Sequence, residues 1–138
     1  MKYRFDHEKL SVYQKSLHFV GWAETLLEST PRRLAVCDQL DRASTAIPLN
    51  LAEGNGKFTP PDRCRFFDIA RGSALECAAC LDVLVAKGAC PPERVDAGKD
   101  ALHDIVSMLV GLIRSNSPDR LHETPVEYRV GGRRKKKD

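Results

Sequence analysis

The sequence contains no uncharged apolar run that approaches the roughly 20 residues needed to cross a bilayer. It also shows no amino-terminal hydrophobic segment preceded by a basic region, which is the pattern of a secretory signal. The cysteines number five and are scattered along the chain. An odd, scattered set argues against a framework of disulfides and favours reduced thiols. These absences predict a cytoplasmic protein that does not use a membrane.

Motifs for catalysis are also missing. The four histidines do not show the spacing H-E-x-x-H of a zinc site, and the segment EGNGK lacks the Lys-Ser/Thr pair of a phosphate-binding loop. Ser44, Ser73 and Ser107 lie in helical patterns, where a hydroxyl commonly bonds to its own backbone. The sequence therefore predicts that the protein is not an enzyme and binds no cofactor.

Cys77 and Cys80 form the pair C-A-A-C, a spacing found in redox sites and in half of a zinc site. The pair lies in a stripe of small apolar residues with helical spacing, and no second pair completes a set of four ligands. Buried cysteines behave as small hydrophobic residues. We therefore expect both thiols to pack in the core and expect no metal.

Apolar residues recur every three to four positions in four segments, which is the period of an amphipathic helix. We expect helices over residues 7–29, from Pro31 to the glycines at 54–56, over 61–87, and from the prolines at 91–92 to residue 114. No segment of useful length alternates like a strand. Short connections favour antiparallel neighbours. The predicted fold is an all-α, up-down-up-down four-helix bundle over residues 1–118.

Two of these helices have features that affect packing. The first carries two apolar stripes, which form either one wide core face or a core face plus a face for a neighbouring helix or subunit. The stripes are Leu10, Tyr13, Leu17 and Val20, and Val12, Phe19, Ala23 and Leu26. Pro48 lies inside the second helix, where it removes one backbone hydrogen bond. We expect a kink between Ser44 and Pro48.

Residues 39–76 join the second and third helices through a glycine-rich break. The sequence Gly-Asn-Gly at 54–56 tolerates the positive φ that often closes a helix, so we expect the second helix to end there. The sequence Thr-Pro-Pro at 59–61 is the expected start of the third helix. Proline at the first helical positions gives up only a donor that has no partner in the helix.

The same segment carries a specific resemblance. The pattern RAS-x-x-I-P-x-N-x-AEG-x-G, followed by an aromatic pair and IARGS-x-x-E, resembles a four-helix-bundle family. That family includes proteins encoded in intervening sequences of bacterial 23S ribosomal RNA genes, and it is similar to the accessory variability determinants of diversity-generating retroelements. LSVYQKS in the first helix adds to the likeness, which runs from about residue 5 to about residue 116. The resemblance implies a homopentameric ring, and for retroelement members it implies binding to nucleic acid and to a reverse transcriptase.

Charge is distributed unevenly along the chain. The last ten residues carry six basic side chains and one acidic side chain, whereas the other 128 residues carry 16 basic and 18 acidic ones. The bundle is close to neutral, and the tail is basic. A tail of sequence RVGGRRKKKD without apolar periodicity cannot bury enough surface to offset the entropy of ordering it. We expect residues 119–138 to be disordered.

Two sets of polar residues are candidates for a site. The first is a basic set for binding nucleic acid: Lys57, Arg63, Arg65 and Arg71, with Arg133, Arg134, Lys135, Lys136 and Lys137 in the tail. Its alternative reading is a set of solvating charges balanced by Asp62, Asp68 and Glu76. The second is a structural polar network, within the chain or between subunits, made of Arg42, Asn50, Glu53 and Glu76.

Two functional hypotheses follow. The first is a non-catalytic, oligomeric nucleic-acid-binding or scaffold protein that uses the basic surface and the tail, with RNA or DNA as partner. The second is a protein-interaction adaptor whose ring presents a surface to a protein, such as a reverse transcriptase, without binding nucleic acid. Salt-sensitive binding to RNA or DNA favours the first hypothesis, because phosphate contacts release counterions.

Overall fold

Residues 2–31 and 33–116 are described by the computed structural model. They form a short 3-10 turn, η1 (Asp6–Lys9), and four α-helices. The helices are α1 (Ser11–Glu28), α2 (Ala35–Asn55), α3 (Pro60–Ala86) and α4 (Pro92–Asn116). No strand occurs among these residues. The prediction of an all-α fold with four helices is confirmed, and the expected disorder of residues 119–138 lies outside the described part of the chain.

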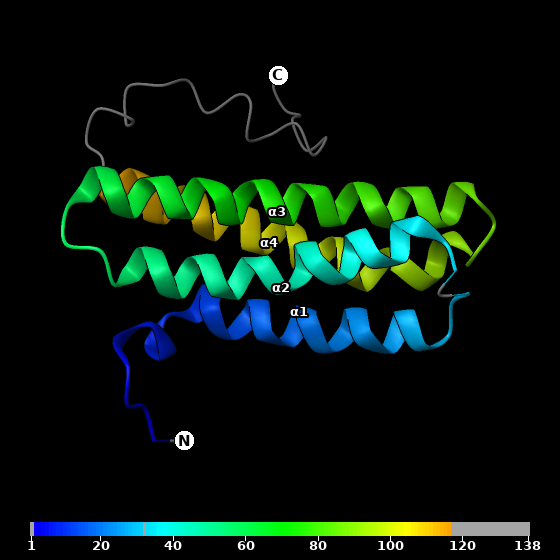
Figure 1. Ribbon diagram of the computed structural model, residues 1–138, viewed down its shortest axis with the longest axis horizontal. Coiled ribbons are helices and arrows are strands. Elements are labelled where there is room, and N and C mark those ends of the chain that lie inside the picture. The colour runs from blue at the N-terminus through cyan, green and yellow to red at the C-terminus, as the bar shows by residue number, and fades with distance from the viewer. Residues whose placement is uncertain (1, 32, 117–138) are drawn as a thin grey trace.

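Consecutive helices are joined at alternate ends of the bundle (Figure 1). The α2–α3 turn lies at the same end as the start of α1 and the end of α4, and we call this end the turn end (Figure 1). The largest contacts join α2 to α3 and α3 to α4, while α1 contacts both α2 and α4. The helices thus surround one common core, and four separate segments of the chain meet at the turn end.

The core takes apolar side chains from every helix. Phe19, Ile47, Phe67 and Ile105 are among its largest fully buried members. On α1, the predicted stripe that contains Phe19 is buried, whereas Leu17 of the other stripe remains 45% exposed. One stripe of α1 therefore faces the core, and a role for the other stripe at a subunit contact stays a prediction. Within the part described, no helix is both long and apolar enough to cross a membrane.

The prediction of one helix over residues 7–29 is wrong at its start. Leu10 is extended, with φ −71° and ψ 126°, and separates η1 from α1. The Glu8 carboxylate accepts hydrogen bonds from the backbone N–H groups of Arg4 (2.6 Å) and Phe5 (3.1 Å). The bond from Arg4 is the main reason why the pKa of Glu8 is lowered. These local bonds favour a separate capped turn over an earlier start of the α-helix.

The second helix also differs from the prediction at both ends. It begins at Ala35 and not at Pro31, because the N–H of Leu34 bonds to the carbonyl of Pro31 (3.2 Å) in a preceding turn. At its other end Gly56 has φ −86°, so no positive φ closes this helix. The positive φ among the described residues falls at Gly88 (74°), which follows Lys87, the C-cap of α3. At the end of α3, glycine is needed for its backbone conformation. At the end of α2, Gly54 is needed because α3 packs too closely for a side chain.

The second helix is continuous through Pro48. Pro48 has no N–H, so the carbonyl of Ser44 loses its helical donor. The hydroxyls of Ser44 and Thr45 donate to the carbonyl of Asp41 (3.0 and 2.9 Å), and bonds of this kind often bend a helix. Figure 1 shows α2 changing direction part-way along its length. The structure therefore agrees with one bent helix and not with two separate helices.

Cys77 and Cys80 are 0% and 5% exposed, so the prediction that they pack in the core is confirmed. Burial is the main cause that raises the pKa of the Cys77 thiol to about 12, and burial also raises the pKa of Cys80. Both thiols stay protonated at neutral pH, and a protonated thiol is a poor nucleophile and a poor metal ligand. Residues 2–31 and 33–116 contain no cluster of His, Cys, Asp and Glu arranged to hold a metal ion.

Candidate nucleic-acid interface

Two local features fix the α2–α3 turn: close packing of the end of α2 on α3, and a cap at the start of α3. A Cβ atom on Gly54, in the last turn of α2, would lie 2.9 Å from the Cβ of Phe66 and 2.9 Å from the Cε1 of Phe67. Glycine therefore lets the end of α2 pack directly on α3. At the start of α3, the hydroxyl of Thr59 accepts a hydrogen bond from the backbone N–H of Asp62 (3.4 Å) and caps the helix.

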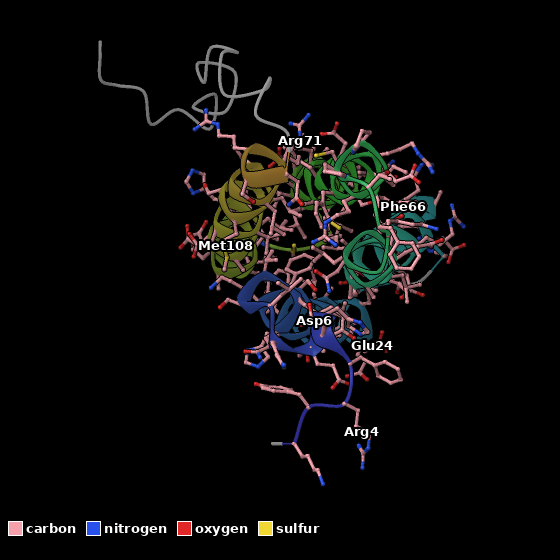
Figure 2. All side chains as sticks on the ribbon, turned by 90° about the vertical axis from the view of Figure 1, so that its left-hand side faces the viewer. Arg4, Asp6, Glu24, Phe66, Arg71 and Met108 are labelled. Atoms are coloured by element: carbon pink, nitrogen blue, oxygen red, sulfur yellow. The ribbon has the colours of Figure 1, made fainter. Side chains whose placement is uncertain are left out.

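Two cations flank one aromatic ring on the outer side of this turn. The Nζ of Lys57 lies 5.0 Å from the centroid of the Phe66 ring, and the Cζ of Arg65 lies 4.6 Å from it. Figure 2 looks at the turn end and shows Phe66 on the outside of the bundle, beside α2 and α3. Phe58, next to Lys57 in the turn, is fully exposed. We call Lys57, Phe58, Arg65 and Phe66 the outer cluster.

The cations of the outer cluster have loosely held acidic neighbours. Lys57 Nζ lies 3.9 Å from Glu53 Oε2, and Arg65 Nη2 lies 3.5 Å from Asp62 Oδ1. All four side chains are at least 36% exposed. Exposed pairs of this kind contribute at most about 1 kcal/mol. Either cation can therefore exchange its carboxylate for another anion at little cost.

Arg63 lies on the inner side of the turn and binds groups from other segments. Its Nε donates to Asn116 Oδ1 (2.8 Å), and its Nη1 donates to the carbonyls of Asn55 (2.7 Å) and Lys57 (3.3 Å). Its Nη2 donates to Asn55 Oδ1 (3.3 Å), and Asn55 in turn donates to Asp6 Oδ2 (3.0 Å). We call Arg63, Asn55, Asn116 and Asp6 the inner hub. The hub connects η1, α2, α3 and α4 at the turn end.

This position corrects one part of the sequence prediction. Arg63 and Arg65 are grouped together by their spacing in the sequence, but residues two apart on a helix point about 200° away from each other. Arg63 is half-buried and Arg65 is exposed. The grouping of Arg63 with Arg65 in one cluster is wrong, because the N–H groups of Arg63 are engaged by the protein. A contact of Arg63 with nucleic acid stays a prediction. Lys57 and Arg65 are the predicted basic residues that the structure brings together.

Arg71 lies apart from the outer cluster. Its Nε is 3.6 Å from Asp68 Oδ1, and the two side chains are 28% and 32% exposed. Figure 2 shows Arg71 and Phe66 on different sides of the bundle. The predicted tail residues Arg133, Arg134, Lys135, Lys136 and Lys137 lie outside the described residues. The last described residue, Asn116, lies at the turn end, and the tail follows it in the sequence.

The predicted polar network does not form within the described part of one chain. Arg42, Glu53 and Glu76 are exposed on α2 and α3. Asn50 is half-buried and donates to the carbonyl of Ala46 (2.8 Å) on its own helix. Glu53 is the neighbour of Lys57 described above. A network between subunits that uses these exposed side chains stays a prediction.

The aromatic members of the outer cluster are absent from the sequence prediction. Phe66 and Phe67 are neighbours in the sequence, but Phe67 is fully buried and Phe66 is half-buried. Phe58 offered a usable signal, because it is a large apolar residue in a short turn between Lys57 and Thr59. No local signal identifies Arg63 as an inner residue, because its partners come from segments far apart in the sequence.

These features define a small helical bundle with a cationic and aromatic surface at one end. The model of the 23S rRNA-intervening sequence protein family matches residues 8–111. The chain therefore belongs to this family. It is also similar to a solved protein of unknown function from the S23 ribosomal protein family of Bacteroides thetaiotaomicron, with 22% identity and a TM-score of 0.70. That match covers 75% of this chain and 98% of the other, and it bears on the fold alone. No curated protein matches.

Proposed function

We propose that the protein is a non-catalytic nucleic-acid-binding or scaffold protein of the cytoplasm. In this proposal the helices form an antiparallel, up-down-up-down bundle that assembles as a homopentameric ring. The outer cluster and the basic tail contact the phosphates of RNA or DNA. The resemblance to ring-forming and nucleic-acid-binding relatives supports the assembly and the class of partner.

The outer cluster is the observation that carries the proposal. The side chains of Lys57 and Arg65 are 36% and 60% exposed, and both cations lie within 5.0 Å of the centroid of the same aromatic ring. Cations interleaved with aromatic rings are typical of surfaces that bind nucleic acid, because cations contact phosphates and rings contact bases. The weak pairs with Glu53 and Asp62 leave both cations available for exchange.

The place where the tail begins adds to this argument. Arg63 holds Asn116, the last residue of α4, at the turn end. The basic residues 133–137 follow in the sequence, and an extended chain spans at most about 3.3–3.6 Å per residue. The tail is therefore long enough to bring its cations to a nucleic acid bound at the outer cluster. Phosphate contacts made by the tail and by the outer cluster would then both raise the affinity for the same nucleic acid.

Assembly into a pentamer would strengthen this binding, because it repeats the outer cluster. One outer cluster offers two cations, and a second contact made on the same assembly benefits from a high effective concentration. Exposed apolar side chains on three helices, Leu17, Leu49 and Ile69, are candidates for the subunit contact. A head-to-tail contact closes into a ring when its rotation permits. Light scattering after size exclusion should give five times the 15.4 kDa chain mass, and a monomer at micromolar concentration would contradict the ring.

The binding test is a salt titration with labelled RNA and DNA. Affinity should fall steeply between low and physiological salt, because each neutralised phosphate adds to the slope of log affinity against log salt. Replacing Arg65 by Met should reduce this slope by about one for each chain that is engaged. An absence of binding at about 20 mM salt, where electrostatic attraction is exaggerated, would reject nucleic acid as the partner.

An adaptor function without nucleic acid is the second candidate. The observation in its favour is that each cation of the outer cluster has a carboxylate neighbour, so the local charge is balanced. Fully exposed Phe58 would then insert into a pocket of a partner protein, such as a reverse transcriptase. Binding to a protein encoded at the same locus, if this binding persists at high salt, would support this candidate over the first.

A further inference from the structure

We propose that the outer cluster recognises unpaired bases, so that the preferred ligand is single-stranded nucleic acid and Phe58 is its stacking residue. In this arrangement a base lies on the ring of Phe58, and Lys57 and Arg65 contact phosphates beside it. The inference rests on the proposed function and adds to it the class of nucleic acid.

Phe58 is the most exposed large apolar side chain among the described residues, with a relative exposure of 101%. By contrast, Phe66 is half-buried and is flanked by Lys57 and Arg65. The two rings therefore have different roles. Phe66 positions the cations, whereas Phe58 keeps its faces free for a ligand.

The backbone holds Phe58 in a fixed position. The N–H of Lys57 donates to the carbonyl of Gly54 (3.1 Å), and the carbonyl of Lys57 accepts from Arg63 (3.3 Å). After Phe58, Thr59 caps α3, and Pro60 begins this helix with a restricted φ. A ring presented on a turn that is fixed on both sides loses little conformational freedom when it binds.

The shape of the cluster favours single strands over duplexes. Reading the major groove of a B-form duplex requires a helix or a two-stranded ribbon that enters it, whereas the free ring of the outer cluster is carried by a short turn. Bases in a duplex are already stacked, and a ring can reach their faces only after unstacking them. An unpaired base has a free face, and stacking on an aromatic side chain raises affinity by about 5- to 150-fold per base.

The experiment compares one RNA sequence in two forms, a labelled single strand and the same strand annealed to its complement. The full-length chain is tested beside Phe58→Ala, Phe58→Trp and the control Leu75→Ala, since Leu75 is also exposed (49%) on α3. Phe58→Ala should weaken binding to the single strand about tenfold and leave duplex binding unchanged. Leu75→Ala should behave as the unmodified chain, and all variants should keep its helical circular dichroism.

A second measurement reports stacking directly. Phe58→Trp should retain single-strand affinity, and its additional fluorescence, relative to the chain with Trp22 alone, should be quenched by the single strand and not by the duplex. The salt slope of Phe58→Ala should match that of the unmodified chain, because no charge is removed. This unchanged slope distinguishes a stacking residue from a phosphate contact.

Each adverse outcome has its own meaning. Equal affinity for the two RNA forms, or an unaffected Phe58→Ala variant, would overturn the single-strand inference and leave the proposed function standing. Failure of the unmodified chain to bind either RNA form, together with failure to bind DNA in the salt titration, would overturn the proposed function and the inference with it. A Phe58→Ala variant with a reduced molecular mass in light scattering would instead place this ring at a contact between copies of the chain, which also overturns the inference.

Discussion

The inner and outer sides of the α2–α3 turn use the same kinds of residue for different purposes. Each side pairs an arginine with a phenylalanine: Arg63 with Phe67 on the inner side (5.7 Å to the ring centroid), and Arg65 with Phe66 on the outer side (4.6 Å). On the inner side, Phe67 is fully buried and Arg63 donates four hydrogen bonds to the protein. On the outer side, Arg65 is held by one loose ion pair.

This difference shows that the role of a side chain at the turn depends on its direction. The inner pair closes one end of the bundle, because it connects the ends of α2 and α4 to α3. The outer pair contributes little to folding, because exposed ion pairs are weak. Its one cation, Arg65, is therefore available for binding. Substitutions that are matched between the two sides can separate stability from function.

The largest expected difference lies between Phe67 and Phe66. Phe67→Ala should lower the free energy of unfolding by about 3–5 kcal/mol, because it removes a fully buried aromatic side chain and leaves a cavity. Phe66→Ala should lower it by less, since Phe66 is half-buried. Urea unfolding followed by circular dichroism measures both values. Equal losses for the two variants would contradict the division into inner and outer sides.

The arginines give the next largest difference. Arg63→Met should cost about 2–3 kcal/mol of stability, because it leaves the carbonyls of Asn55 and Lys57 without their donor. Arg65→Met should change stability by less than about 0.5 kcal/mol. The order should reverse in the salt titration, where Arg65→Met is the variant that reduces the slope. A stability loss for Arg65→Met as large as that for Arg63→Met would contradict the distinction between the inner and outer sides.

The buried thiol of Cys77 on α3 should make the stability of the protein depend on pH. Burial raises the pKa of Cys77 to about 12 from its ordinary value of 9.0. Between these values the unfolded chain releases a proton that the folded chain keeps, so stability is complete below pH 9 and falls as the pH rises. The fall should be about 2 kcal/mol between about pH 9 and 10.5. Cys77→Ala should reduce this fall in stability with pH, whereas Cys90→Ala, which removes a partly exposed thiol, should leave it unchanged.

Gly54, which packs between α2 and α3, and Gly72, which meets no neighbour, should give smaller effects of opposite sign. Gly54→Ala should lower stability by about 1–2 kcal/mol, because its Cβ would meet the Cβ of Phe66 at 2.9 Å. Gly72→Ala should raise stability by up to about 1 kcal/mol, because its Cβ would meet nothing within 4 Å and alanine favours the helix. Thermal unfolding of the two variants checks both signs. A stabilising Gly54→Ala would show that α2 and α3 can separate without loss.

The smallest expected effect on stability is that of removing residues 129–138. A basic tail without apolar periodicity should leave the melting temperature unchanged while it lowers the salt slope of nucleic-acid binding. Arg65→Met combined with the truncation should lower the slope further. A lower melting temperature for the truncated chain would show that the tail belongs to the folded unit.

Periodicity and turn chemistry predict the helices well but place their ends less well. The four helices, the proline within α2 and the cap at Thr59 follow from spacing and from proline and threonine preferences. The starts of α1 and α2 differ from the prediction, because bonds to Glu8 and Pro31 create separate turns before each helix. Such bonds compete with the helix at energies too similar for a pattern to decide.

The candidate site is predicted in part. Lys57 and Arg65 follow from their positive charge near the break at 54–56, and the structure places both beside Phe66. Position along the chain groups Arg63 and Arg71 with them, but in the structure both face elsewhere. Sequence distance is a poor guide to direction on a helix, where each residue rotates by about 100°.

The sequence by itself determined the helical class, the breaks between the helices and the concentration of positive charge in the tail, because these depend on local spacing and composition. The tertiary structure alone decided which face of α3 is inner and which is outer. It brought Asp6, Asn55, Arg63 and Asn116 together from four segments, placed Lys57 and Arg65 beside Phe66, and left Phe58 exposed. These outcomes depend on how the helices pack against one another, and packing joins residues whose separation in sequence carries no local signal.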